Sequence, residues 1–214
     1  MRVGTALMQA VQVAAVNGSI RVPGAPGPAP TVHASLLGVD ALLFLAVDEH
    51  EHERRRSAGM TAVFDKDSLW LLSRLPHGEA VCVADLTDRE RRGLRGLPRG
   101  VAIVAGGEVT RLSIPPVSIR LAVVTDDVPD RGLDRASKFA PFAPRMLVLP
   151  GPTDDLASTE VEARFYGIGL AVAGSDSVIT MADPEPARRS IGPVTWRVRE
   201  QAYAAFLETV GECA

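Results

Sequence analysis

The stretch from Val117 to Pro150 constrains the fold most, because it indicates a strand, a helix and a second strand in direct succession. Val117–Val124 alternates and then becomes continuously apolar, which is typical of a strand that is buried on at least one face. Pro129 can begin a helix, since its missing N–H would have no partner in the first turn, and Pro141 lies where that helix must end. Met146–Leu149 is a second apolar run. Strands joined in this way are expected to lie parallel, with a right-handed crossover.

Apolar spacing predicts further helices and strands on both sides of this stretch. Helices are expected over Val3–Val16 and Thr195–Val210, because apolar residues recur there every three or four positions. The apolar run that begins at Val32 and passes into charged residues predicts one long helix over Val32–Arg55. The remaining elements expected are a helix over Leu156–Tyr166 and strands over Ile168–Ala173 and Val178–Met181. Together they indicate an α/β protein with mixed α and β segments, in which helices flank a mixed sheet.

The region from residue 65 to residue 113 has its own order of elements. Asp65–Leu75 is typical of a helix and Ala80–Val83 of a short strand, and Thr87 with Glu90 forms a capping box that begins a second helix. Apolar runs on either side of Gly106-Gly107 predict a hairpin. This order resembles a winged helix, in which the last helix enters the major groove and the hairpin touches the DNA backbone. A usual winged helix has two helices between the first strand and the hairpin, and here only one is expected.

The winged-helix resemblance implies that the helix Thr87–Leu97 would read DNA. The arginines on this helix, after it and on the hairpin would contact phosphates, namely Arg89, Arg91, Arg92, Arg95, Arg99 and Arg111. Asp88 and Glu90 reduce the positive charge of the helix, and the alternative interpretation is a solvated face that carries arginines. The net charge of −3 gives no support to strong non-specific nucleic-acid binding by the chain as a whole.

The second half of the chain resembles the closing half of restriction-endonuclease-like, PD-(D/E)XK, proteins. The resemblance covers roughly residues 101–184 and is carried by the strand Leu121–Thr125, a helix with Ala136 and Phe139, a strand ending in Leu149-Pro150, and a helix leading into Gly167-Ile168-Gly169-Leu170. In that superfamily a strand carries Glu-x-Lys or Asp-x-Lys, and the acid binds a divalent metal. The matching positions here are Val123 and Thr125, which provide neither a metal ligand nor a charge. The resemblance therefore implies a nuclease-like scaffold without its catalytic pair.

Acidic residues after the central strand offer an alternative metal site. Asp126, Asp127 and Asp130, with Asp134 nearby, follow the strand end, where ligands bind in α/β sheets and where clustered carboxylates can hold Mg²⁺. The alternative is that these residues complement the dipole at the start of the next helix. The run Asp48–Glu53 also contains two histidines, but these would point to opposite sides of a helix, which favours a solvated helix end.

The sequence thus predicts three consecutive segments: a helical region over 1–64, a winged-helix-like element over 65–113 and a degenerate nuclease-like domain over 114–214. The leading hypothesis is a non-catalytic regulatory or nucleic-acid-associated protein that needs no cofactor, with duplex DNA as the expected nucleic acid and the nuclease-like domain as a scaffold or homodimer surface. The alternatives are a metal-dependent nuclease or other enzyme that uses the acidic cluster, and a module that binds a protein partner. The chain shows no clear signal peptide and no apolar run long enough for a membrane span, so a cytoplasmic location is expected.

Overall fold

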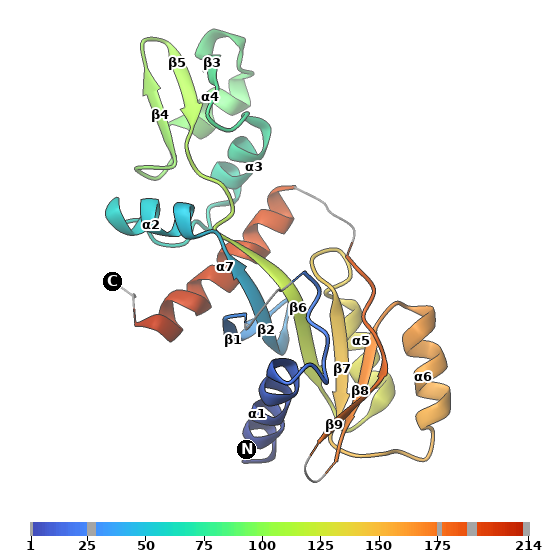
Figure 1. The fold of residues 1–214 in the computed structure, drawn as a ribbon. Helices are drawn as coiled ribbons and strands as arrows, with labels where there is room; N and C mark the ends of the chain where they lie inside the picture. Colours follow the sequence, from blue (N-terminus) through green and yellow to red (C-terminus); the bar gives the residue numbers. More distant parts are fainter. Residues whose placement is uncertain (1, 25–28, 175–176, 188–191, 212–214) are drawn as a thin grey trace. The chain divides into compact units, whose positions relative to one another are not determined.

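The computed structural model of the 214-residue chain describes residues 2–24, 29–174, 177–187 and 192–211. The chain divides into two compact units, each made of two separate stretches (Figure 1). Unit 1 comprises residues 1–46 and 119–189, and unit 2 comprises residues 47–118 and 190–214. The boundaries expected after residues 64 and 113 both fall inside unit 2, because the N-terminal residues join the later strands in one sheet.

Unit 1 is built on a six-stranded sheet of order β1-β2-β6-β7-β8-β9. The strands β6, β7 and β8 are parallel to one another, whereas β1 pairs with β2, and β8 with β9, in antiparallel fashion. The bounds are β1 Thr31–Leu36, β2 Val39–Val47, β6 Val117–Thr125, β7 Arg145–Leu149, β8 Gly169–Ala173 and β9 Val178–Ala182. Three helices accompany the sheet, α1 (Arg2–Val16), α5 (Pro129–Ser137) and α6 (Leu156–Phe165). The predicted α/β class with a mixed sheet and flanking helices is confirmed.

The two faces of this sheet are covered by different helices. Met8 and Val11 of α1 belong to a buried cluster with the alternate strand residues Val123, Met146 and Val148. On α5, Gly132 lies so close to the next residue of β7, Leu147, that an added Cβ would be 2.5 Å from its Cδ1 atom. Because neighbouring side chains on a strand point to opposite faces, α1 and α5 pack on opposite sides of the sheet.

The predicted strand–helix–strand unit is confirmed by β6, α5 and β7. The two strands are parallel neighbours, with Val123 opposite Met146 and Thr125 opposite Val148. Pro129 occupies the first turn of α5, where its missing N–H costs no helical hydrogen bond. The strands predicted for β8 and β9 and the helix predicted for α6 are also present, within two residues of the expected bounds.

The long helix expected over Val32–Arg55 is wrong. This segment forms the hairpin β1–β2 and then the short helix α2 (Glu49–Ser57). Leu37 and Gly38 have φ values of 57° and 72°, and positive φ at both central residues is what a two-residue hairpin turn requires. The second half of the apolar run forms β2, an inner strand with five consecutive buried residues. A continuous apolar run of this kind does not distinguish a buried strand from a buried helix.

Unit 2 combines a small antiparallel sheet with helices. The sheet has the order β3-β5-β4. The elements of unit 2 are α2, α3 (Lys66–Arg74), β3 (Ala80–Cys82), the 3₁₀ turn η1 (Val83–Asp85), α4 (Asp88–Leu94), β4 (Ala102–Ala105), β5 (Glu108–Arg111) and α7 (Pro193–Val210). The predicted helices over α3 and α7 and the hairpin at Gly106-Gly107 are confirmed, while α4 ends three residues before the expected Leu97. None of the helices described, in either unit, combines the length and the apolar character needed to cross a membrane.

A buried ion network lies at the centre of unit 2. The guanidinium of Arg55, which is 0% exposed, donates at 2.8 Å to each carboxylate oxygen of Glu200 and at 2.7 Å to Glu51. Glu200 also accepts from the backbone N–H of Val63 at 2.9 Å and from Nε1 of Trp196 at 2.8 Å. Burial acts to raise the pKa of Glu51, but hydrogen bonds from its two neighbouring arginines on α2 outweigh it and hold the pKa below its usual value. The network joins α2 and α7 through paired charges.

Candidate functional site

The short helix α4 is fixed at its start by a capping box. Thr87 accepts at 3.3 Å from the N–H of Glu90, and the Glu90 carboxylate accepts from the N–H of Thr87 at 2.8 Å. Arg74 of α3 donates to the same carboxylate at 2.8 Å, which joins the two helices. These hydrogen bonds, first that from Arg74 and then those from Thr87, lower the pKa of Glu90 to about 2. Glu90 therefore fixes the start of α4 and joins this helix to α3.

The predicted arginines of this region are in two different situations. Arg92, Arg95 and Arg99 are exposed, and within the residues that the structure describes, their side chains have no ion pair or hydrogen bond. Arg91 is engaged, because it donates to Asp88 at 2.7 Å and to the carbonyl of Ala84 at 3.2 Å. Three guanidiniums at and just after the end of α4 thus remain available to an outside anion.

Arg111 is used inside unit 2. Its guanidinium donates at 2.7 Å to the carbonyl of Leu72 and lies 5.5 Å from the ring centre of Trp196. Burial lowers its pKa, as expected for a cation that is partly removed from water. The residue lies on the hairpin strand as predicted, but its contacts hold β5 against α3 and α7.

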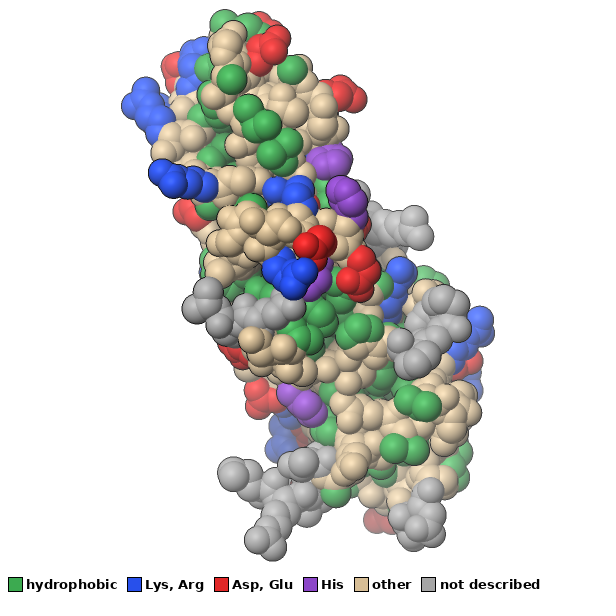
Figure 2. Space-filling view, turned by 60° about the vertical axis from the view of Figure 1, so that its left-hand side comes forward, with side chains coloured by type: hydrophobic (Ala, Val, Ile, Leu, Met, Phe, Trp, Pro, Cys, Tyr) green, Lys and Arg blue, Asp and Glu red, His purple; other side chains and the backbone are tan. Residues whose placement is uncertain are grey.

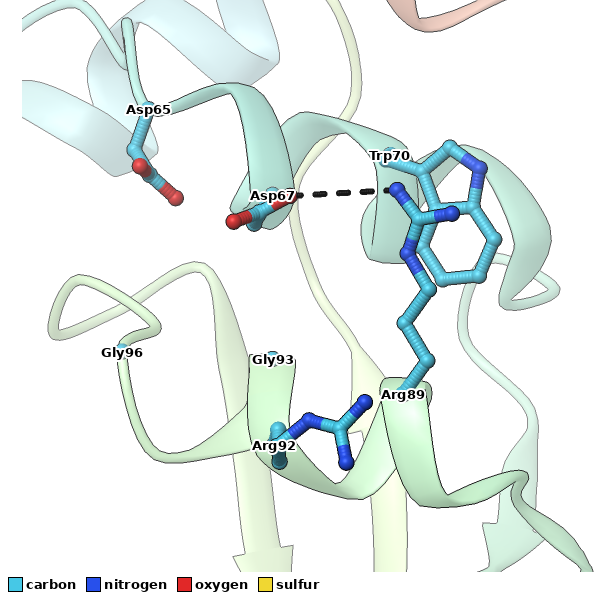
Figure 3. A pocket seen from close by; sticks show the side chains of 7 residues that line it. All are labelled: Asp65, Asp67, Trp70, Arg89, Arg92, Gly93 and Gly96. Carbon is cyan, nitrogen blue, oxygen red and sulfur yellow. Dashed lines mark ion pairs between the residues drawn. The ribbon is translucent and has the colours of Figure 1, made fainter.

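Arg89 lies over an aromatic ring that the sequence reasoning missed. Its guanidinium carbon is 4.2 Å from the ring centre of Trp70, and its nearest carboxylate, Asp67, is 4.0 Å away (Figure 3). Arg74 approaches the same ring at 5.2 Å. In the sequence Trp70 directly follows the core residue Leu69. Its partial exposure depends on which side of α3 faces the core, and the sequence alone does not predict this.

Trp70 and Arg89 line a pocket of about 480 Å³ between α3 and α4. The α3 side contributes Asp65, Asp67 and Trp70, and the α4 side contributes Arg89, Arg92 and glycines (Figure 3). The close approach of the helices depends on Gly93, where an added Cβ would lie 3.3 Å from the side chain of Leu71. The pocket therefore combines an aromatic face, two guanidiniums and two carboxylates in a space of the size that small ligands occupy.

The acidic residues proposed as an alternative metal site lie in unit 1, after β6. Asp126 is buried and accepts from Arg131 at 2.6 Å and from Arg135 at 2.8 Å, so both of its oxygens are occupied by guanidiniums. Burial alone would raise the pKa of Asp126, but these hydrogen bonds and one from the N–H of Val128 hold it well below its usual value. Asp127 pairs with Arg131 at 2.7 Å. No group of three or more potential metal ligands occurs among the described residues.

Two further observations bear on the function. Comparison with known proteins finds no matching family model, no similar curated protein and no similar solved structure. On the face drawn in Figure 2, lysine and arginine side chains lie in separate groups among acidic and apolar ones. A ligand of opposite charge on this face would therefore meet small groups of arginines, without a continuous basic surface.

Proposed function

We propose that the protein is a non-catalytic regulatory protein that binds duplex DNA through unit 2, with α4 in the groove and the β4–β5 hairpin beside the backbone. The observation that carries the proposal is a set of three exposed guanidiniums that form no hydrogen bond or ion pair with any described residue, namely Arg92, Arg95 and Arg99. Exposed cations of this kind can neutralise phosphates and release counterions.

The order of elements in unit 2 supports this use of α4. Between the strand β3 and the hairpin lie the three-residue 3₁₀ turn Val83–Asp85 and α4, so this turn stands where a usual winged helix has its other helix. The hairpin tip at Gly106-Gly107 carries exposed Ile103 and Val104 beside it. A hairpin that follows a helix with exposed arginines fits contact with a DNA groove and its adjacent backbone.

The proposal includes no cleavage of DNA because of the residues at the nuclease-like positions of unit 1. Val123, at the position of the superfamily's acid, is 0% exposed and apolar, and Thr125 takes the position of its lysine. The nearest acid along the chain, Asp126, already neutralises two arginines. We therefore expect unit 1 to act as a scaffold.

The test is the salt dependence of duplex binding, measured by fluorescence anisotropy. Each phosphate contact contributes about 0.9 to the slope of log K against log salt concentration, so replacing Arg92 and Arg95 by alanine should flatten the slope by about two. Arg164→Ala is the matched control, because this arginine is 59% exposed but lies in unit 1 and pairs with Glu160. A slope that is unchanged in the double variant, or equally changed in the control, would contradict the proposal.

A further inference from the structure

The pocket between α3 and α4 offers a face on which a flat ring can stack and two guanidiniums, Arg89 and Arg92, that can meet a negative group attached to that ring, beside the carboxylates of Asp65 and Asp67. Trp70 provides an aromatic face that is only partly buried. Any of the nucleobases can stack on such a face, because each has a flat aromatic ring. Arg92 lines the same pocket and forms no hydrogen bond or ion pair with any described residue, although the charge of Asp88 acts on it. A stacking surface and an exposed guanidinium therefore border a single space of about 480 Å³.

The side chain that covers the indole face of Trp70 can be displaced by a ligand. Arg89 stacks on it at 4.2 Å, but this side chain is 58% exposed and its nearest carboxylate, Asp67, is at the limiting distance of 4.0 Å. A guanidinium held mainly by an exposed aromatic contact is weakly bound. An incoming ring can take its place on the indole, and Arg89 then remains close enough to meet the negative group attached to that ring.

We infer that this pocket is a subsite for an unpaired nucleobase with its phosphate, in which the base stacks on Trp70 and the phosphate meets Arg92 and the displaced Arg89. The inference rests on the proposed function for the source of the base, which would be an unpaired nucleotide at the end of, or extruded from, the bound nucleic acid. A free nucleotide offers the same chemistry, and the experiment separates the two sources.

The first measurement uses the fluorescence of the full chain. Its two tryptophans differ, because Trp196 is 1% exposed and bonded to Glu200, whereas Trp70 lines the pocket. Deoxyguanosine 5′-monophosphate should quench the emission saturably, after correction for light absorbed by the nucleotide, and inorganic phosphate should not. The quenching should disappear in Trp70→Phe, which removes the reporter but keeps an aromatic ring. Quenching that persists in Trp70→Phe, or none in the wild type, would overturn the subsite.

The second measurement compares a blunt duplex with the same duplex carrying a single-stranded overhang, by anisotropy. The wild type and Trp70→Phe should prefer the overhang. Trp70→Leu, which keeps an apolar side chain but has no flat ring, should bind the overhang about ten-fold or more weakly and keep its binding of the blunt duplex. Arg92→Ala should weaken the binding of deoxyguanosine monophosphate more than the binding of deoxyguanosine. Emission of Trp196 and circular dichroism monitor folding of each variant.

The outcomes separate the subsite from the proposed function. Blunt-duplex binding with neither quenching nor a preference for the overhang removes the subsite and leaves the function. Quenching by the free nucleotide without any duplex binding removes the function and assigns the pocket to free nucleotides. Equal loss of blunt and overhang binding in Trp70→Leu, in a folded variant, contradicts the subsite, because the residue would then act on the duplex surface alone.

Discussion

Replacing Glu200 by alanine should destabilise unit 2 by about 3–5 kcal/mol, the usual cost of removing one partner from a buried ion pair. The carboxylate accepts four hydrogen bonds, two from Arg55 and one each from the N–H of Val63 and Nε1 of Trp196. Its loss leaves two buried donors without an acceptor, each of which costs about 1–3 kcal/mol, and leaves a fully buried cation with one carboxylate. The remaining carboxylate, Glu51, also serves Arg54, so it cannot compensate fully.

Urea unfolding followed by tryptophan fluorescence measures this effect, because both tryptophans of the chain, Trp70 and Trp196, lie in unit 2. For a slope of about 2 kcal/mol/M, the midpoint should fall by about 2 M. Glu208→Ala is the matched control, since Glu208 lies exposed on the same helix, and its replacement should cost less than about 0.5 kcal/mol.

An equal effect of Glu200→Ala and Glu208→Ala would refute the reasoning. A double variant, Arg55→Met with Glu200→Leu, tests the cause more closely. It removes both charges of the pair, so it should cost less than the sum of the single replacements, although Val63 and Trp196 keep their orphaned donors. Strict additivity would mean that the unpaired charge is not the source of the loss.

Three further changes test other parts of the structure. Glu90 has a pKa lowered to about 2 from an ordinary 4.5, so its stabilisation of unit 2 should be complete above pH 4.5 and fade as the pH falls toward 2; the urea midpoint should lose this pH dependence in Glu90→Gln. Leu37→Gly should raise the stability of unit 1 by about 0.5–1 kcal/mol in thermal unfolding followed by circular dichroism, because Leu37 has a φ of 57°. Gly132→Ala should cost about 1–3 kcal/mol by the same method, since its Cβ would lie 2.5 Å from Leu147, whereas Gly151→Ala, which meets nothing within 4 Å, should not.

Local chemistry explains which elements the sequence could predict. Thr87 and Glu90 form a capping box whatever lies around them, and Gly106-Gly107 favours a hairpin by backbone geometry alone. The β6–α5–β7 unit is marked by apolar runs and prolines. The apolar run in β2 is ambiguous, because its strand character depends on neighbours on both sides in the sheet. The division into two interleaved units has the same cause, since it depends on pairing between strands that are far apart in the sequence.

The candidate site was predictable only as a list of arginines. Nothing in the spacing separates Arg99, which is exposed and has no hydrogen bond or ion pair with any described residue, from Arg111, which donates to the carbonyl of Leu72. A long guanidinium side chain can turn outward to water or inward to a backbone oxygen, and the choice depends on which groups lie within its reach. The pocket at Trp70 depends on how α3 and α4 pack. Gly93 allows this close packing, but a glycine in the sequence does not by itself predict it.

The split of unit 2 across the chain has a consequence for biosynthesis. Residues 47–118 leave the ribosome well before Glu200 and Trp196, since the intervening 119–189 belongs to unit 1. At about 5–20 residues per second, roughly 4–15 s pass between these stretches. Throughout that interval Arg55 lacks its main counter-charge and the core around Leu69 lacks its tryptophan. During this interval the nascent residues 47–118 should therefore be most exposed to chaperones and proteases. The synthesis and packing of α7 should end this exposure.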